Sequence, residues 1–111
     1  MRSYFAELEY IYVTTTGRKT GRAREIEIWF VEYQGRLFIL AEHFFKTQWV
    51  LNIANNPSVK VRVAGVEYTA MARILDKESE TETWIATQRL AREKYGWGDG
   101  LPVELTLDEK E

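Results

Sequence analysis

The sequence predicts a mainly β protein with two helices, folded as a small closed or split barrel. Six segments show the alternation or the β-branched and aromatic enrichment of strands, and two others place apolar residues at helical spacing. Most strand connections are short enough for hairpins, which favours an antiparallel sheet. Six strands in a chain of 111 residues favour a barrel with both helices packed outside it.

The first half of the chain predicts three strands. Residues 8–16 alternate apolar with polar or aromatic residues, and residues 24–33 set isoleucines and a phenylalanine against glutamates and a tryptophan. Gln34-Gly35 is a hairpin signal, and the apolar run 37–41 follows it. Because that run is continuous, we expect the third strand to be more buried than the first two.

The middle of the chain predicts a short helix followed by two strands. Residues 47–55 have apolar residues at helical spacing, and Pro57 ends this helix because proline cannot continue it. Valines alternate with cations at 59–63, which predicts a half-exposed strand. Gly65 then turns the chain into a long strand at 66–75.

The C-terminal part predicts a longer helix and a last strand. Ser79 followed by Glu82 is a capping-box pattern, which predicts a helix over 79–95. A glycine-rich loop containing Trp97 separates this helix from a strand at 101–107. A tryptophan in so flexible a loop is either an interface anchor or a lid over a ligand, and both readings stay open.

Composition narrows the class of protein. The length predicts one domain over 1–111. A net charge of -2, from 15 basic and 17 acidic residues, argues against general nucleic-acid binding, which needs a large basic face. No cysteine and a single histidine exclude disulfides, thiolate metal sites and a His-rich metal centre. We therefore expect neither a metal site nor a nucleic-acid partner.

The chain also lacks the marks of a membrane or secreted protein. No apolar run approaches the roughly 18 residues that a membrane-spanning helix needs. Glu7 and Glu9 follow the first residues closely, which is unlike a signal peptide. We expect a cytoplasmic protein with no membrane span.

A cationic loop between the first two strands is the most informative feature. Its four cations stand without an acid among them, and Gly17 and Gly21 separate them. Glycines allow sharp turns that expose backbone N–H groups, and arginine and lysine bind phosphate or carboxylate. The spacing matches neither a P-loop nor a Rossmann fingerprint. The loop is therefore either another kind of anion site or a solvated hairpin loop. The cations are Arg18, Lys19, Arg22 and Arg24.

The segment between the third strand and the first helix is a second candidate. A helix N-terminus favours anions, and His43 and Lys46 add positive charge beside it. Phe44, Phe45 and Trp49 could cover a flat ring. The alternative is that these aromatic residues belong to the core and that His43 is an ordinary surface histidine.

No pairing of a nucleophile with a general base stands out, so no catalytic residue is assigned. Glu25 and Glu27 are paired carboxylates, but the apolar face opposite them indicates that they face solvent. An enzyme without acid–base machinery is physically sensible where a cofactor supplies the chemistry.

Two motifs resemble the deazaflavin-dependent nitroreductase family, within the split-β-barrel FMN-binding superfamily. They are TTGRKTGR at 15–22 and W-x-x-N-x-x-x-N-P-x-V at 49–59, and the similarity extends over about 11–75. The resemblance implies a six-stranded antiparallel split β-barrel, commonly a homodimer with the cofactor near the interface. It implies hydride transfer between a 5-deazaflavin (coenzyme F-420) or FMN and a small-molecule acceptor such as a nitro compound or a quinone. A non-catalytic module that binds or carries a flavin-like ligand is the alternative.

The resemblance also implies site residues. The loop residues that match the family's phosphate-binding segment are Arg18, Lys19 and Thr20, with Arg24 opening the next strand. That strand passes the ring system at Ile28 and Trp29, and the helix start adds Gln48, Trp49 and Asn52. Where the family commonly has two glycines and a lysine, this chain has His43-Phe44-Phe45-Lys46. The role of that lysine would fall to His43 or Lys46, or be lost.

Overall fold

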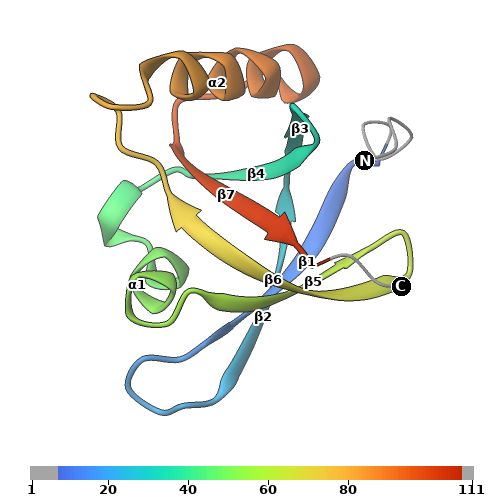
Figure 1. Cartoon of the computed structure of the whole chain (residues 1–111), viewed down its shortest axis with the longest axis vertical. Coiled ribbons are helices and arrows are strands. Elements are labelled where there is room, and N and C mark those ends of the chain that lie inside the picture. The colour runs from blue at the N-terminus through green and yellow to red at the C-terminus, as the bar shows by residue number, and fades with distance from the viewer. Residues whose placement is uncertain (1–7, 109–111) are drawn as a thin grey trace.

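The computed structural model describes residues 8–108, which form seven strands and two α-helices (Figure 1). The strands are β1 (Tyr10–Thr16), β2 (Ala23–Trp29), β3 (Val31–Tyr33), β4 (Arg36–Ala41), β5 (Ser58–Val63), β6 (Val66–Ile74) and β7 (Leu101–Leu107). The helices are α1 (Gln48–Asn55), preceded by a short 3-10 turn at Phe44–Lys46, and α2 (Thr81–Tyr95). The prediction of a mainly β chain with two helices is confirmed. Within the described residues, no helix is long and apolar enough to cross a membrane.

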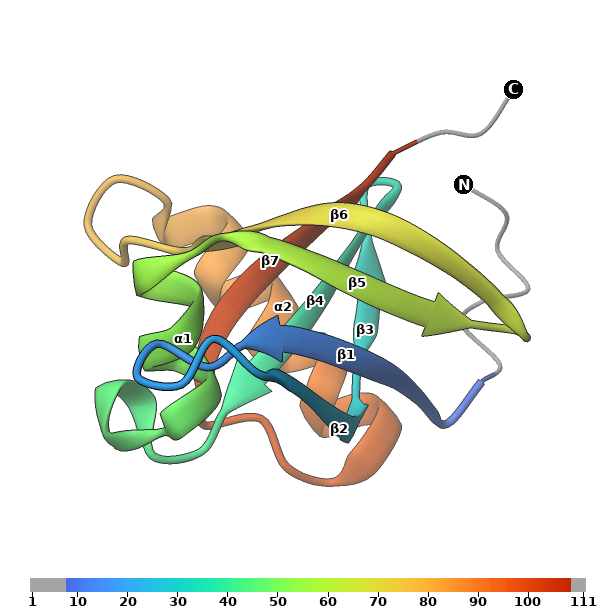
Figure 2. The same ribbon diagram turned by 90° about the horizontal axis from the view of Figure 1, so that it is seen from below.

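All seven strands belong to one antiparallel sheet with the order β2-β1-β5-β6-β7-β4-β3. The strands β2 and β3 lie at opposite edges of this order, yet only Phe30 separates them in the chain. The sheet must therefore curl and bring its two edges near each other, which makes it a half-barrel (Figure 2). The ladder itself stays open between those edges.

The predicted six-strand count is wrong because the segment 24–33 is two strands. Its first part pairs with β1 and its last part pairs with β4, so the chain changes partners at Phe30. There the hydroxyl of Tyr95 replaces a neighbouring strand. It accepts a hydrogen bond from the Phe30 N–H at 3.1 Å. Its single proton faces two backbone carbonyl oxygens, that of Glu9 at 2.6 Å and that of Phe30 at 2.8 Å.

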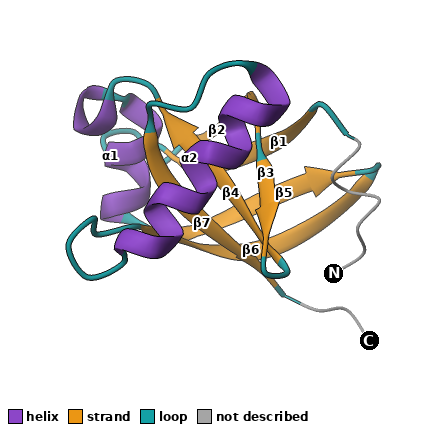
Figure 3. Cartoon of the chain, turned by 90° about the horizontal axis from the view of Figure 1, so that it is seen from above, coloured by secondary structure: helices purple, strands orange, loops and turns teal. Residues whose placement is uncertain are grey.

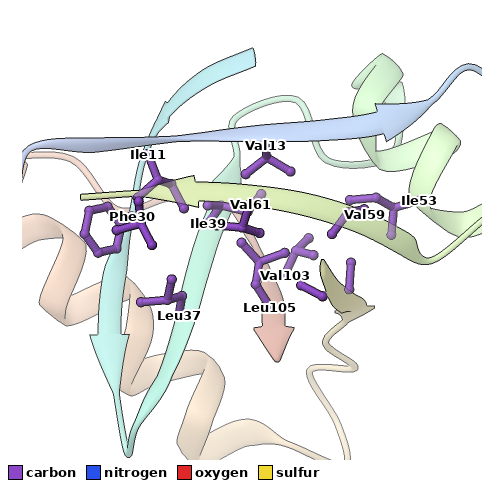
Figure 4. Packing of buried hydrophobic residues seen from close by; sticks show 13 residues of the cluster. Ile11, Val13, Phe30, Leu37, Ile39, Ile53, Val59, Val61, Val103 and Leu105 are labelled. Carbon is purple, nitrogen blue, oxygen red and sulfur yellow. The ribbon is translucent and has the colours of Figure 1, made fainter. Parts of the chain in front are cut away.

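The barrel interior holds the main apolar core (Figure 4). Alternation directs every second side chain of each strand inward, as the sequence pattern predicts. The fully buried residues of this core come from β1, β4, β5 and β7 and from Phe30, which lies between β2 and β3. They include Ile11, Val13, Phe30, Leu37, Ile39, Val61, Val103 and Leu105.

A second apolar cluster lies on the outer face of one half of the sheet. There α2 covers β3, β4 and β7 (Figure 3). Trp84 and Ala91 of the helix pack with Phe38 and Leu40 of β4. Because β4 is buried on both faces, it has the continuous apolar run that predicted a buried strand.

The predicted start of α2 at a capping box is wrong. The Ser79 hydroxyl donates to the Asp76 carboxylate at 2.9 Å, and the helix begins at Thr81 with no side-chain cap. The carboxylate of Glu80 accepts the Asp76 N–H at 3.0 Å instead. The helix ends at Gly96, whose φ of 78° is the left-handed conformation that favours glycine.

Candidate functional site

The cationic loop between β1 and β2 is closed by its own backbone. The N–H of Gly17 donates to the Arg22 carbonyl at 2.8 Å, and the N–H of Gly21 donates to the Gly17 carbonyl at 2.8 Å. A Cβ on Gly17 would stand 2.9 Å from the hydroxyl oxygen of Thr20, so the turn has no room for a side chain there. Gly21 has a φ of 72°, which glycine adopts without strain.

Arg18 ties this loop to α1. Its backbone N–H and its Nη1 both donate to the Oδ1 of Asn52, at 3.2 and 2.9 Å, and its Nη2 donates to the Oε1 of Gln48 at 2.9 Å. Asn52 is buried, and its Nδ2 donates to the hydroxyl of Thr15 at 3.3 Å. These bonds hold the loop against the helix.

A hollow of about 410 Å³ lies between the loop, β2 and α1, and we call it the loop hollow. No acid lines it, and Lys19 and Arg24 of its wall form no ion pair and no side-chain hydrogen bond within residues 8–108. Ile26 and Trp49 supply an apolar part of the wall. The hollow therefore combines unpaired positive charge with an apolar surface. Its lining is Thr15, Gly17, Arg18, Lys19, Thr20, Arg24, Ile26, Gln48, Trp49 and Asn52.

A second hollow, of about 450 Å³, follows further along β2, and we call it the aromatic hollow. The rings of Trp29 and Tyr95 stack beside it with centroids 4.4 Å apart and planes 2° apart. This hollow is lined by two carboxylates, from Glu27 and Glu42, and by no lysine or arginine, so its charge is opposite to that of the loop hollow. Its lining is Tyr10, Glu27, Ile28, Trp29, Phe30, Val31, Leu40, Glu42, Ala91, Tyr95 and Trp97.

The end of α2 supplies two groups that the sequence reading missed. Burial raises the pKa of the Tyr95 hydroxyl and lowers the pKa of the Lys94 ammonium. The Nζ of Lys94 donates to the Phe30 carbonyl at 3.1 Å and lies 4.0 Å from the centroid of the Phe30 ring. The available signal was helical spacing, since Tyr95 follows the buried Ala91 by four residues.

The structure separates the predicted site residues into three groups. The loop hollow collects those of the loop and of α1, whereas Ile28 and Trp29 line the aromatic hollow. His43 and Lys46 line neither hollow. His43 is exposed, and its Nε2 lies 3.8 Å from a carboxylate oxygen of Glu42. The first group is Arg18, Lys19, Thr20, Arg24, Gln48, Trp49 and Asn52.

The loop that contains Trp97 lies beside the aromatic hollow. Trp97 is half-buried and lines that hollow, and a Cβ on Gly100 would lie 2.8 Å from its ring. Among the residues that the structure describes, no three His, Cys, Asp or Glu side chains gather to hold a metal.

The molecule is an open half-barrel with a cationic and an aromatic hollow along β2. The chain belongs to the F420H(2)-dependent quinone reductase family, whose model matches residues 3–104. This match confirms the resemblance that the two sequence motifs carried.

Solved structures share the fold. The F420-H2 dependent reductase FDR-A is 25% identical with a TM-score of 0.66, over 90% of this chain and 94% of that one. The heme storage protein HutZ from Vibrio cholerae is 18% identical with a TM-score of 0.76, over 96% and 87% of the two chains. A FAD-binding protein from Mesorhizobium loti is 9% identical with a TM-score of 0.71, over 98% and 91%.

Proposed function

We propose that this protein is a reductase that uses a reduced 5-deazaflavin, coenzyme F420, or its flavin counterpart FMN, and passes a hydride to a small organic acceptor. Family membership supports the cofactor class, since the family is named for F420H(2). The observation that carries the proposal is the loop hollow. It offers two unpaired cations, Lys19 and Arg24, on a loop that Arg18 and Asn52 hold in place.

The chemistry of the loop hollow fits the tail of such a cofactor. A phosphate needs positive charge and N–H donors, and Lys19 and Arg24 supply the charge without giving up another partner. The apolar wall at Ile26 and Trp49 suits the edge of a flat ring. When bound, the reduced cofactor would supply the hydride, which explains why no acid–base pair is needed in the protein.

The ring and its acceptor belong, in this proposal, along β2 beyond Ile26. Ile28 leads from the loop hollow into the aromatic hollow, where Trp29 and Tyr95 present stacked rings. A planar acceptor such as a quinone or a nitroaromatic compound is complementary to such walls. The protein's own part is to bind both molecules in adjacent hollows and to exclude water between them.

A spectroscopic titration with F420 and, separately, with FMN tests the binding step. We expect one of them to bind with a change in fluorescence, and the reduced form to be oxidised on addition of quinone or nitroaromatic acceptors. Protein that binds neither cofactor would contradict the proposal. Trp29→Ala should then weaken acceptor turnover more than cofactor binding, because Trp29 lies in the aromatic hollow.

The second candidate is a non-catalytic module that binds or carries a flavin-like ligand. The fold likeness to the heme storage protein HutZ favours keeping it, because the same half-barrel serves storage there. Steady-state turnover separates the two candidates. Tight cofactor binding without turnover for any quinone or nitroaromatic acceptor would favour the carrier.

A further inference from the structure

Aromatic rings make up much of the wall of the aromatic hollow. The rings of Trp29 and Tyr95 are stacked, and those of Tyr10 and Trp97 come from the start of β1 and from the loop after α2. Tyr10 is 41% and Trp29 45% exposed, so part of each side chain stays accessible to a ligand. The face of an aromatic ring carries partial negative charge and attracts cations. The wall therefore suits either a neutral flat molecule or a cationic one.

Two carboxylates line the same hollow. Glu27 lies on β2 and Glu42 follows the end of β4, so the acids come from two strands that are not neighbours in the sheet. Glu27 accepts a hydrogen bond from the Tyr12 hydroxyl at 3.1 Å. Glu42 lies 3.8 Å from His43, which is charged only when it is protonated. Within residues 8–108, neither carboxylate forms an ion pair with a lysine or an arginine.

Lys94 lies near this hollow but does not line it. Its Nζ donates to the Phe30 carbonyl, and it lies 4.0 Å from the centroid of the Phe30 ring and 5.0 Å from that of Tyr95. Glu9 and Glu32, which also lie outside the hollow, attract this ammonium. Two rings of the wall therefore already contact a cation of the protein, and acids other than Glu27 and Glu42 offset the charge of that cation.

We propose that the aromatic hollow selects flat aromatic acceptors that carry a positive charge and rejects those that carry a negative one. The ring faces attract a cation, and the carboxylates of Glu27 and Glu42 attract it further. The same two carboxylates repel an anion, and neutral quinones and nitroaromatics fall between the two. The inference rests on the proposed function in calling the ligand an acceptor, whereas the charge preference itself is a binding property that needs no cofactor.

The two hollows thereby sort ligands by charge along one strand. Arg24 at the start of β2 lines the loop hollow, and Glu27 of the same strand lines the aromatic hollow. A phosphorylated tail is attracted to the first and repelled from the second, so the tail does not compete with the acceptor for the aromatic hollow. The opposite holds for a cationic acceptor.

Three probes with the same nitrobenzyl ring test this preference. They are para-nitrobenzyl trimethylammonium, para-nitrobenzyl alcohol and para-nitrophenylacetate, which are cationic, neutral and anionic. We expect calorimetric titration at low salt to give a dissociation constant for the cation about tenfold or more below that of the anion, with the alcohol between them. The loop hollow also attracts the anion, so the titrations are repeated in Lys19→Ala/Arg24→Ala, which lacks two of its cations.

The variant Glu27→Gln/Glu42→Gln removes both carboxylates with little change of shape. We expect it to reduce the preference for the cation over the anion by about fivefold or more, and each single variant to reduce it partly. Both residues are exposed, and thermal unfolding checks that the variants fold. Glu93→Gln is the matched control, because it removes the same charge from an exposed residue that lines neither hollow. Salt should weaken the preference in the wild type, because exposed charges are screened.

Equal affinity for the three probes, or a preference that Glu27→Gln/Glu42→Gln leaves unchanged, would overturn the inference. Failure of every probe to bind would overturn it as well. Steady-state reduction of the probes by the reduced cofactor distinguishes this failure from failure of the proposed function. Turnover without charge preference would overturn the inference and support the reductase, whereas the expected order of binding without turnover would support the inference and contradict the reductase.

Discussion

One oxygen atom of Asn52 accepts two hydrogen bonds from Arg18, one from its backbone N–H and one from its guanidinium. A residue of α1 thereby fixes both the main chain and the side chain of a residue 34 positions away. The pairing gives Arg18 a positioning role. Lys19 and Arg24, which also line the loop hollow, have no such partner within residues 8–108.

Replacing Asn52 by alanine should release the loop. Asn52 is buried and bonds to Arg18 and Thr15, so its loss leaves their polar groups without those partners. We expect Asn52→Ala to lower the free energy of unfolding by about 1–3 kcal/mol and to weaken binding of the phosphorylated cofactor. Urea denaturation and cofactor titration measure the two effects. Asn55→Ala, at an exposed position of the same helix, is the control. Equal losses of stability and of cofactor affinity in the two variants would contradict the positioning role of Asn52.

Tyr95 should make stability depend on alkaline pH. Burial raises the pKa of its hydroxyl above the ordinary value of 10.0, so the folded protein keeps it neutral while the unfolded chain ionises. Its contribution is therefore fully present below pH 10 and is lost as pH rises through the folded pKa. Tyr95→Phe should be less stable at neutral pH by about 1–2 kcal/mol, because the hydrogen bonds of its hydroxyl to the backbone of Phe30 and Glu9 disappear. It should also lose less stability above pH 10.

Urea denaturation at neutral and at alkaline pH compares the wild-type protein with Tyr95→Phe. Tyr10→Phe is a matched control, since Tyr10 is exposed and its hydroxyl makes no hydrogen bond within the described residues. If the free energy of unfolding of Tyr95→Phe equalled that of the wild type at neutral pH and fell equally above pH 10, the hydroxyl of Tyr95 would not stabilise the change of strand partners at Phe30.

Neutralising the carboxylate of Glu104 should destabilise the fold. It is buried on β7, forms an ion pair with Arg36, and accepts a hydrogen bond from the Nε of Arg73 at 3.1 Å. Arg73 also pairs with Glu80, and these two carboxylates raise its pKa. We expect Glu104→Gln to lower the free energy of unfolding by about 1.5–3 kcal/mol.

The control for Glu104 is Glu93→Gln on the exposed side of α2. Glu93 lies 3.9 Å from Arg89, and a surface pair of that kind contributes less than about 1 kcal/mol. Thermal or urea unfolding of both variants is sufficient. A loss no larger for Glu104→Gln than for Glu93→Gln would mean that the buried carboxylate contributes nothing beyond an exposed one.

Local pattern predicted most elements of the fold. Alternation located β1, β5 and β7, and the continuous apolar run located β4. The change of partners at Phe30 was not visible, because Ile26, Ile28 and Phe30 continue one inward alternation across it. What changes there is the hydrogen-bond partner of the backbone, and the partner is Tyr95, 65 residues away. No local pattern carries that information.

The candidate site was predictable where its residues lie close together in the chain. Three of the four cations of the loop, Arg18, Lys19 and Arg24, line one hollow together with the start of α1, whereas Arg22 does not line it. The aromatic hollow was not foreseen, because it joins β2 to the end of α2 and to the loop of Trp97. His43 was included for its possible positive charge beside the helix start and for its place in the segment where the family has a lysine, and it lines neither hollow.

The most direct test of the account is to remove the two unpaired cations together. Lys19→Ala/Arg24→Ala should weaken binding of the phosphorylated cofactor by at least about tenfold and leave binding of a ring analogue without the phosphate nearly unchanged. Arg89→Ala, on the exposed side of α2, is the control for lost positive charge. Fluorescence titration measures all of these affinities. Equal losses for the cofactor and for the ring analogue, or no loss for either, would contradict a loop hollow that binds the phosphate.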